Sequence, residues 1–258
     1  MSWSRAALIE KLKSIKSLGW IPSRRSVKQA GGVGNTLEDL LGIEENNIPL
    51  ANAGIWELKA QRRGTSSLIT LFHFEPEPRD VKVVVNVLLP KYGWPHETRR
   101  GEMSFRVTMR GDRYTDRGFR IIVNRDEERV YVSFNYRHVS RKHEEWLRHV
   151  AERAGLGEID PQPYWTFKAL QRKCREKLRN LVYVLADTRR TSRGEEFYYN
   201  EAWLLEGFSF ERFINGIESG LVLIDFDART GHNHGTKFRI RNDLRTWAAL
   251  YSFVQRIM

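Results

Sequence analysis

The chain is organised around residues 46–61, which read NNIPLANAGIWELKAQ. Their second half follows a turn marked by proline and glycine, and it is predicted to be a short β-strand. Alternate side chains of a strand share a face, so Glu57 and Lys59 are expected to point the same way. Trp56 and Leu58 would then enter the opposite layer. The simplest interpretation is an exposed face with a Glu–Lys pair, since a buried charge is costly unless it is paired or binds a metal.

A second motif lies upstream, in residues 34–42, GNTLEDLLG, which predict a short helix with its leucines on one side. Together, this helix and the E-L-K strand resemble the MutH-like branch of the PD-(D/E)xK nucleases. The likeness is greatest to the MvaI/BcnI group of restriction endonucleases. In that pattern a G-x-T-L-E helix supplies one carboxylate, an aspartate follows in the turn before the strand, and E-L-K completes the set.

The resemblance implies a set of catalytic residues. Glu38 matches the helix carboxylate, Glu57 the strand acid and Lys59 the strand lysine, while the aspartate is expected at position 52. The residue at position 52 and Glu57 would hold Mg²⁺ at the scissile phosphate, and Lys59 would orient the attacking water. Glu38 would assist as an outer or second-metal carboxylate.

Position 52 departs from that pattern, because the chain has Asn52 there. Asparagine has nearly the size and shape of aspartate, but it is neutral and half of its head group is a donor. Magnesium prefers anionic oxygens, so Asn52 weakens the expected cage. It is interpreted as an inactivating substitution or as natural degeneration. Alternatively, the missing acid is supplied by Glu44 or Glu45.

Length and composition favour a globular protein. The chain has 258 residues, 41% of them hydrophobic and 12% aromatic, which is enough to bury a core. It contains no apolar run near the roughly 20 residues of a membrane helix, and no secretory signal is recognised at its start. Cys174 is the single cysteine, which excludes an internal disulfide. We therefore expect a cytoplasmic protein, bacterial or archaeal, without membrane partners.

The net charge restricts the class of binding partner. There are 43 Lys and Arg residues against 32 Asp and Glu, a formal net charge of +11. Such an excess is typical of proteins that bind a polyanion, most often nucleic acid. Guanidinium groups suit bidentate contacts to phosphate and guanine. Basicity alone would equally suit a protein that binds ribosomal RNA or tRNA, so it does not identify a reaction.

The rest of the chain alternates helices and strands. Helices are predicted at 2–18, 143–155, 165–178 and 209–218. After a turn at 61–64, a paired antiparallel strand is predicted at 67–74. Further strands are predicted at 81–89, 103–109, 119–123, 130–134, 181–186 and 196–205, and the proline-broken stretch 160–163 is the expected lobe boundary.

Two smaller features remain open. The basic loop 22–32, with Arg24 and Arg25, is either a solvated connector or a grip on the DNA backbone. His73 sits in an apolar strand, and a core or groove-facing histidine that contacts DNA is preferred over a metal ligand.

A polar loop between two C-terminal strands is the second candidate site. The stretch 223–241, LIDFDARTGHNHGTKFRIR, could bind a metal through His232, His234 and Asp225 or Asp227. The letters His-Asn-His imitate the HNH motif, but that family separates them widely. A similar segment lies on the recognition side of MvaI/BcnI-type enzymes, which implies base reading. The DNA-binding residues would be Asp227, Arg229, His232, His234, Lys237, Arg239 and Arg241.

These inferences combine into one prediction. The fold would be α+β, a PD-(D/E)xK mixed sheet flanked by helices, in one nuclease domain over residues 1–258. A catalytic lobe, 1–110, and a recognition lobe, 160–258, would clasp double-stranded DNA. The resemblance implies a monomeric, Mg²⁺-dependent type II restriction endonuclease that cuts a CCNGG-like site one strand at a time, with a cognate DNA methyltransferase. The alternatives are a MutH-like mismatch-repair nicking enzyme and a non-cleaving DNA-binding protein.

Overall fold

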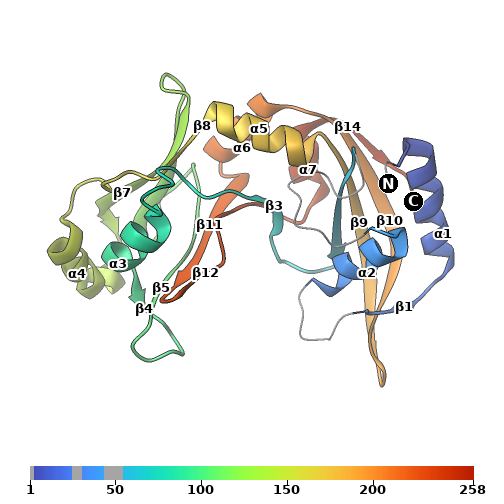
Figure 1. Cartoon of the computed structure of the whole chain (residues 1–258), viewed down its shortest axis with the longest axis horizontal. Helices are drawn as coiled ribbons and strands as arrows, with labels where there is room; N and C mark the ends of the chain where they lie inside the picture. The colour runs from blue at the N-terminus through green and yellow to red at the C-terminus, as the bar shows by residue number, and fades with distance from the viewer. Residues whose placement is uncertain (1–2, 25–30, 44–54) are drawn as a thin grey trace. The chain divides into compact units, whose positions relative to one another are not determined.

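Residues 3–24, 31–43 and 55–258 are described by the computed structural model (Figure 1). The chain forms two compact units. The first comprises Met1–Ile69, Lys173–Phe210 and Arg241–Met258, and the second comprises Thr70–Arg172 and Glu211–Ile240. The continuous lobes expected at 1–110 and 160–258 do not follow these boundaries, because strands that are distant in the sequence pair within each unit.

A mixed sheet forms the centre of the first unit. Its strands are β1 (Ile21–Pro22), β10 (Gly194–Phe208), β9 (Asn180–Thr191) and β2 (Glu57–Arg62) in spatial order, and β14 (Tyr251–Arg256) also pairs with β10. The E-L-K strand β2 runs parallel to β9, with Glu57 opposite Leu181. The pairings of β10 with β1, β14 and β9 are antiparallel. The expected mixed sheet flanked by helices is confirmed.

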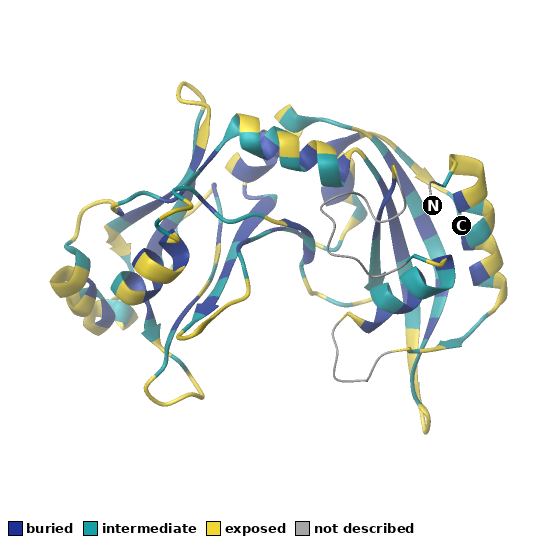
Figure 2. Cartoon of the chain, viewed as in Figure 1, coloured by how far each residue is buried: buried dark blue, intermediate teal, exposed yellow. Residues whose placement is uncertain are grey.

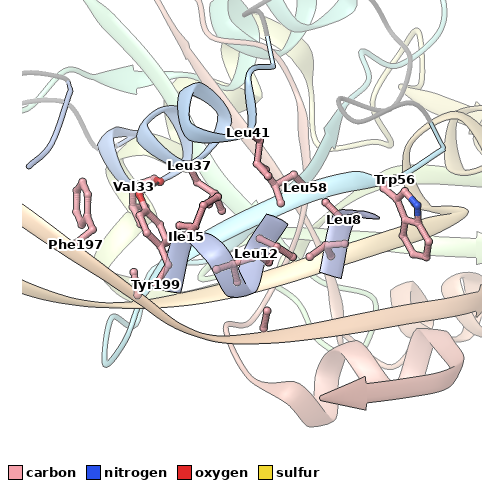
Figure 3. Close-up of a cluster of buried hydrophobic side chains, with 14 of the residues drawn as sticks. Leu8, Leu12, Ile15, Val33, Leu37, Leu41, Trp56, Leu58, Phe197 and Tyr199 are labelled. Atoms are coloured by element: carbon pink, nitrogen blue, oxygen red, sulfur yellow. Dashed lines mark hydrogen bonds between the residues drawn. The ribbon is translucent and has the colours of Figure 1, made fainter. Parts of the chain in front are cut away.

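One face of this sheet is covered by α1 (Arg5–Ser17) and α2 (Gly32–Leu41) (Figure 3). Ser4 caps α1 by accepting a hydrogen bond from the Ala7 amide at 3.2 Å. The helix then buries Leu8, Leu12 and Ile15 at helical spacing, while its other side is exposed in Figure 2. The same cluster receives Val33, Leu37 and Leu41 of α2, Trp56 and Leu58, and apolar side chains of β9 and β10.

The opposite face of the sheet carries α5 (Phe167–Leu178) and α7 (Leu244–Leu250). Tyr183 of β9 packs on Trp247 with ring centroids 5.5 Å apart. The Tyr251 hydroxyl donates to the Leu178 carbonyl at 2.8 Å, which ties the end of α5 to the start of β14. Since Leu58 enters the α1–α2 core, Glu57 and Lys59 face this second layer.

The second unit contains two further sheets. One has the order β3 (Ile69–His73), β13 (Lys237–Ile240), β11 (Val222–Arg229), β5 (Met103–Met109) and β4 (Trp94–Pro95), with β12 (His232–Asn233) paired to β11. The other has the order β6 (Arg117–Asn124), β7 (Arg129–Val139) and β8 (Tyr164–Thr166). The helical segments of this unit are η1 (Val84–Leu88), α3 (Leu89–Tyr92), η2 (Arg141–His143), α4 (Glu144–Ala154) and α6 (Phe210–Glu218). Its core is aromatic, with Phe119 packed on Phe105 and Phe134 at 5.5 and 5.3 Å between ring centroids.

One predicted strand is wrong. The run 81–89 is not a strand but leads into η1 and α3, and Val84, Val87 and Leu88 are buried along the helix. A short, uniformly apolar run has no periodicity that separates a strand from a buried helix. The strand predicted at 67–74 is present as β3, but its sheet neighbour is β13 and not β2. In the part of the chain that the structure describes, no helix has the length and apolar character needed to cross a bilayer.

Candidate active site

Glu57 occupies the first position of β2 and is almost completely buried, with 3% of its surface exposed. Its Oε1 accepts a hydrogen bond from Lys59 Nζ at 2.8 Å. The predicted same-face pair is therefore confirmed. Its interpretation as an exposed surface pair is wrong, because α5 and α7 cover this side of the sheet.

A second lysine approaches the same carboxylate. Lys177, in the last turn of α5, places its Nζ 3.6 Å from Glu57 Oε2. That oxygen is buried and accepts no hydrogen bond from any residue that the structure describes. The side chains of Lys59 and Lys177 are only 19% and 17% exposed. Two partly desolvated cations thus hold one desolvated anion, since burying the carboxylate alone would cost several kcal/mol.

The groups next to this cluster are uncharged. Burial raises the pKa of the Tyr251 phenol well above its usual range, and the neighbouring Glu57 carboxylate adds to the effect. Burial likewise raises the pKa of the Cys174 thiol. Both side chains therefore stay protonated at neutral pH.

Helix α2 positions the other expected carboxylate. Leu37 and Leu41 pack with Leu58 of β2 in the core, and Glu38, next to Leu37 on the helix, is half-buried. The Arg24 amide donates to Thr36 Oγ1 at 3.1 Å, which fixes the chain just before the undescribed segment 25–30 to this helix. The Arg24 guanidinium lies 3.9 Å from Asp39 and is exposed.

The site fits a divalent cation in part. A buried carboxylate oxygen without a hydrogen bond is the kind of hard, anionic ligand that Mg²⁺ takes. Within residues 3–24, 31–43 and 55–258, however, no group of three or more His, Cys, Asp or Glu side chains gathers around a common point. Asn52 lies outside the described residues, as do Glu44 and Glu45. Glu57 is accordingly the described residue best suited to hold a metal.

A second polar site lies on the β5–β11–β13 sheet of the other unit. Along β11, Phe226 and Ala228 are buried while Asp225 and Asp227 lie on the opposite face. The carboxylate of Asp225 accepts from Thr108 Oγ1 at 2.8 Å and from Arg239 at 3.0 Å. We call this surface, made by Arg106, Thr108, Asp225, Asp227, Lys237 and Arg239, the polar sheet face.

Asp227 has two cationic neighbours on the polar sheet face. It accepts from Lys237 Nζ at 3.0 Å, and Arg106 Nε lies 2.8 Å from its other oxygen. Burial, the largest influence, raises the pKa of Asp227, but Lys237, Arg106 and His234 outweigh it and hold the pKa below its usual value. Asp227 is therefore an acceptor flanked by donors, an arrangement complementary to the donor and acceptor groups on the major-groove edge of a G·C pair.

Glu75 fixes the loop that follows β11 by accepting hydrogen bonds from it. Its carboxylate accepts from the Thr236 amide at 2.7 Å and from Asn233 Nδ2 at 3.4 Å. His232 Nε2 and His234 Nδ1 are 3.2 Å apart, and both rings are exposed. No third ligand joins them among the described residues, so the alternative of a metal site here gains no support.

The comparison with known proteins identifies the family. Residues 9–251 match the sequence model of the MvaI/BcnI restriction endonuclease family. The chain belongs to this family. Its structure is similar to that of the restriction endonuclease MvaI in complex with its cognate DNA, with a TM-score of 0.79 and 24% identity over the whole of both chains. MvaI without DNA gives a TM-score of 0.54 and 21% identity, again over both chains. Among curated proteins, none matches the chain.

For this MvaI/BcnI family member, five of the expected site residues fall into two clusters. Glu57 and Lys59 meet at β2, while Asp227, Lys237 and Arg239 lie together on the polar sheet face. Arg229 forms an ion pair with Glu102, with Nη1 2.9 Å from Oε2. Of the remaining expected residues, His73 is exposed at the end of β3, Arg241 is exposed just after β13, Arg24 is beside α2, and Arg25 is outside the described residues.

The sequence analysis did not select Lys177, Arg106 or Thr108. Lys177 was one of several cations on a basic helix, and nothing in the sequence distinguishes it from its neighbours. Arg106 and Thr108 did carry a signal, because they alternate with Phe105 and Met109 in strand β5 and so mark its polar face. That pattern could have added them to the residues predicted to bind DNA.

Proposed function

We propose that this chain is a type II restriction endonuclease that hydrolyses phosphodiester bonds of duplex DNA in a Mg²⁺-dependent reaction. Its target would be a short, C/G-rich site of the CCNGG kind, bound by a monomer that cuts one strand at a time. The protein would act in the cytoplasm, alongside a DNA methyltransferase of the same specificity. The observation that carries the proposal is the buried Glu57 carboxylate between Lys59 and Lys177, in a chain of this family.

Each residue of the cluster would have its own role in phosphodiester hydrolysis. Glu57, with the residue at position 52, would hold the metal through the carboxylate oxygen that has no hydrogen bond. When bound, Mg²⁺ lowers the pKa of a coordinated water and neutralises charge on the phosphate. Lys59, fixed by its 2.8 Å contact to Glu57, would orient the attacking water and stabilise the anionic transition state. Lys177 would hold the other side of the Glu57 carboxylate in place, which makes it a positioning residue.

Asn52 is expected to lower the rate at which this chain cleaves DNA. A neutral carbonyl oxygen in place of a carboxylate removes one negative charge from the metal cage, so the affinity for Mg²⁺ should fall while the DNA contacts remain. We therefore propose that the chain binds its site but cleaves it very slowly.

Cleavage of phage DNA, with and without Mg²⁺, by this chain and by its Asn52→Asp variant tests the proposal. Discrete fragments from the variant, dependent on Mg²⁺, are expected, and sequencing their ends would give the site. The matched control is Asn52→Asp combined with Glu57→Gln, which keeps the size of the side chain but removes its charge. It should yield no fragments, which also excludes a contaminating nuclease. Failure of Asn52→Asp to increase cleavage would contradict the assignment of position 52.

A second candidate function is a DNA-binding protein whose nuclease site has degenerated, and Asn52 is the feature that favours it. Duplex binding measured in Ca²⁺ and in EDTA separates the two. An enzyme that uses a metal at Glu57 should bind its site more tightly with Ca²⁺, and Glu57→Gln should abolish the difference. A pure binder should be indifferent to the ion. The family match favours restriction over the MutH-like nicking alternative.

A further inference from the structure

A hollow of about 410 Å³ opens in the second unit beside strand β5 and the turn that leads into β6. Four of the residues that line it are arginines. We call it the arginine hollow; the lining residues used here are Trp94, Arg106, Arg110, Arg113, Tyr114 and Arg117. Asp116 is the acidic residue of the lining, so the arginines outnumber the acids. A concave, strongly cationic surface of this kind favours an anionic ligand.

The acid in the lining already contacts two other side chains. Asp116 Oδ2 lies 2.8 Å from Lys142 Nζ and 3.0 Å from His143 Nε2. Two of the arginines also have acidic partners, since Arg110 is 2.7 Å from Asp112 and Arg106 is 2.8 Å from Asp227. Among the described residues, neither Arg113 nor Arg117 forms an ion pair with an acid of the lining, and Asp116 acts on Arg117 only without such a contact.

Arg117 is held in a fixed position without an acidic contact. Its guanidinium carbon lies 4.1 Å from the centroid of the Trp94 ring and 5.6 Å from that of Trp146. Its Nε is buried and has no hydrogen-bond partner among the described residues. Burial lowers the pKa of Arg117, and Asp116 partly offsets this. Stacking uses the faces of a guanidinium and leaves the donors in its plane, which match two oxygens of a phosphate.

The hollow adjoins the polar sheet face. Arg106 and Thr108 line the hollow, and the same two residues pair across the strands with Asp227 and Asp225 of β11. The hollow thus begins where the row of Asp225 and Asp227 ends. Base edges in the major groove are bordered by backbone phosphates, so a surface that reads the edges needs a cationic site next to it.

We propose that the arginine hollow is a subsite for one backbone phosphodiester of duplex DNA, next to the base pairs that meet Asp225 and Asp227. Arg113 and Arg117 supply the donors, and the Trp94 ring keeps the Arg117 guanidinium oriented. This subsite rests on the proposed function, because it takes the polar sheet face to be the surface that reads DNA. It adds a phosphate contact that fixes the register of the protein on the duplex. Base specificity comes from the polar sheet face.

The test measures binding of short duplexes of unrelated sequence over a range of salt concentrations. Arg113 is exposed, so Arg113→Ala should leave the fold intact, and Arg117→Gln removes the second donor. Each variant should weaken binding to every duplex by a similar factor and reduce the magnitude of the slope of log K against log salt by about 0.9. Melting temperatures of both variants check that the protein is folded.

The matched control is Arg125→Ala, which removes the same charge from another exposed arginine of this unit, one paired with Glu211 and Glu218 outside the hollow. Its slope should equal that of the unmodified chain. If the folded Arg113→Ala and Arg117→Gln proteins behave like Arg125→Ala, or lose affinity for some sequences and not others, the phosphate subsite is overturned while DNA binding stands. If the unmodified chain binds no duplex, the proposed function itself fails, and the subsite with it.

Discussion

Lys177 Nζ lies 3.6 Å from Glu57 Oε2, on the opposite side of the carboxylate from Lys59. The contact follows from the topology of the first unit. Helix α5 leads directly into β9, and the start of β9 is paired in parallel with the start of β2, where Glu57 lies opposite Leu181. The last turn of α5 is therefore brought to the first residue of the E-L-K strand.

We predict that Lys177→Ala lowers the single-turnover cleavage rate of the Asn52→Asp protein by about 10²-fold, similar to the loss of one preorganised donor. Because Lys177 acts through Glu57, the Mg²⁺ concentration that gives half of the maximal rate should change as well. Lys177→Arg should restore part of both. Lys168→Ala, an exposed cation on the same helix, is the control and should change neither at saturating enzyme. An unchanged Mg²⁺ dependence in folded Lys177→Ala would contradict the positioning role.

The origin of this contact explains which features of the site could be predicted from the sequence and which could not. Alternation along residues 54–60 predicted which side chains of β2 share a face, and Trp56, Leu58 and the Glu57–Lys59 pair confirm it. Alternation does not tell what covers the polar face. The burial of Glu57 and its contact with Lys177 depend on the pairing of β2 with β9, which joins segments far apart in the chain. Long-range strand pairing leaves little trace in a local pattern.

The second site shows the same limit. The polar residues of β11 and β13 were predicted to contact DNA as a set, and they do share one face of one sheet. The neighbouring strand β5 was predicted as a strand, but its position next to β11 was not, so Arg106 and Thr108 were missed. The error at residues 81–89 has a different cause, since that apolar run is compatible with either a buried strand or a buried helix.

Asp227 is expected to control base discrimination. Asp227→Asn removes a carboxylate that can accept from the cytosine amino group, so discrimination at one base pair should fall by about 1–3 kcal/mol. It also releases Lys237 and Arg106 from their shared acid, and binding to duplexes of random sequence should become tighter. Competition between specific and random duplexes measures both effects. Asp80→Asn, an exposed site with the same charge change, should leave the specificity ratio unchanged. An unaltered ratio in Asp227→Asn would exclude Asp227 from base reading.

Asp116 gives a prediction about stability at acid pH. Lys142 and His143 outweigh the effect of burial and lower the pKa of Asp116 from 3.8 to about 2. A carboxyl whose folded pKa is depressed stabilises the fold above its unfolded pKa and loses this effect as pH falls through the folded value. Asp116→Asn should therefore be less stable at pH above about 4, by no more than about 1 kcal/mol because the pair is partly exposed. The difference should shrink between about pH 4 and pH 2. Urea unfolding at several pH values tests this, with Asp126→Asn as the exposed control.

Leu37 links the hydrophobic core to the candidate active site. It is completely buried among α1, α2 and the sheet, and it precedes Glu38 on α2 (Figure 3). Leu37→Ala should leave a cavity and lower the free energy of unfolding of the first unit by about 2–5 kcal/mol. Leu18→Ala, at a side chain that is 60% exposed, should change it by less than about 0.5 kcal/mol. Chemical denaturation followed by tryptophan fluorescence would measure both. Equal stability of the two variants would mean that α2 does not pack on the sheet as described, and the position of Glu38 beside β2 would then have to be abandoned.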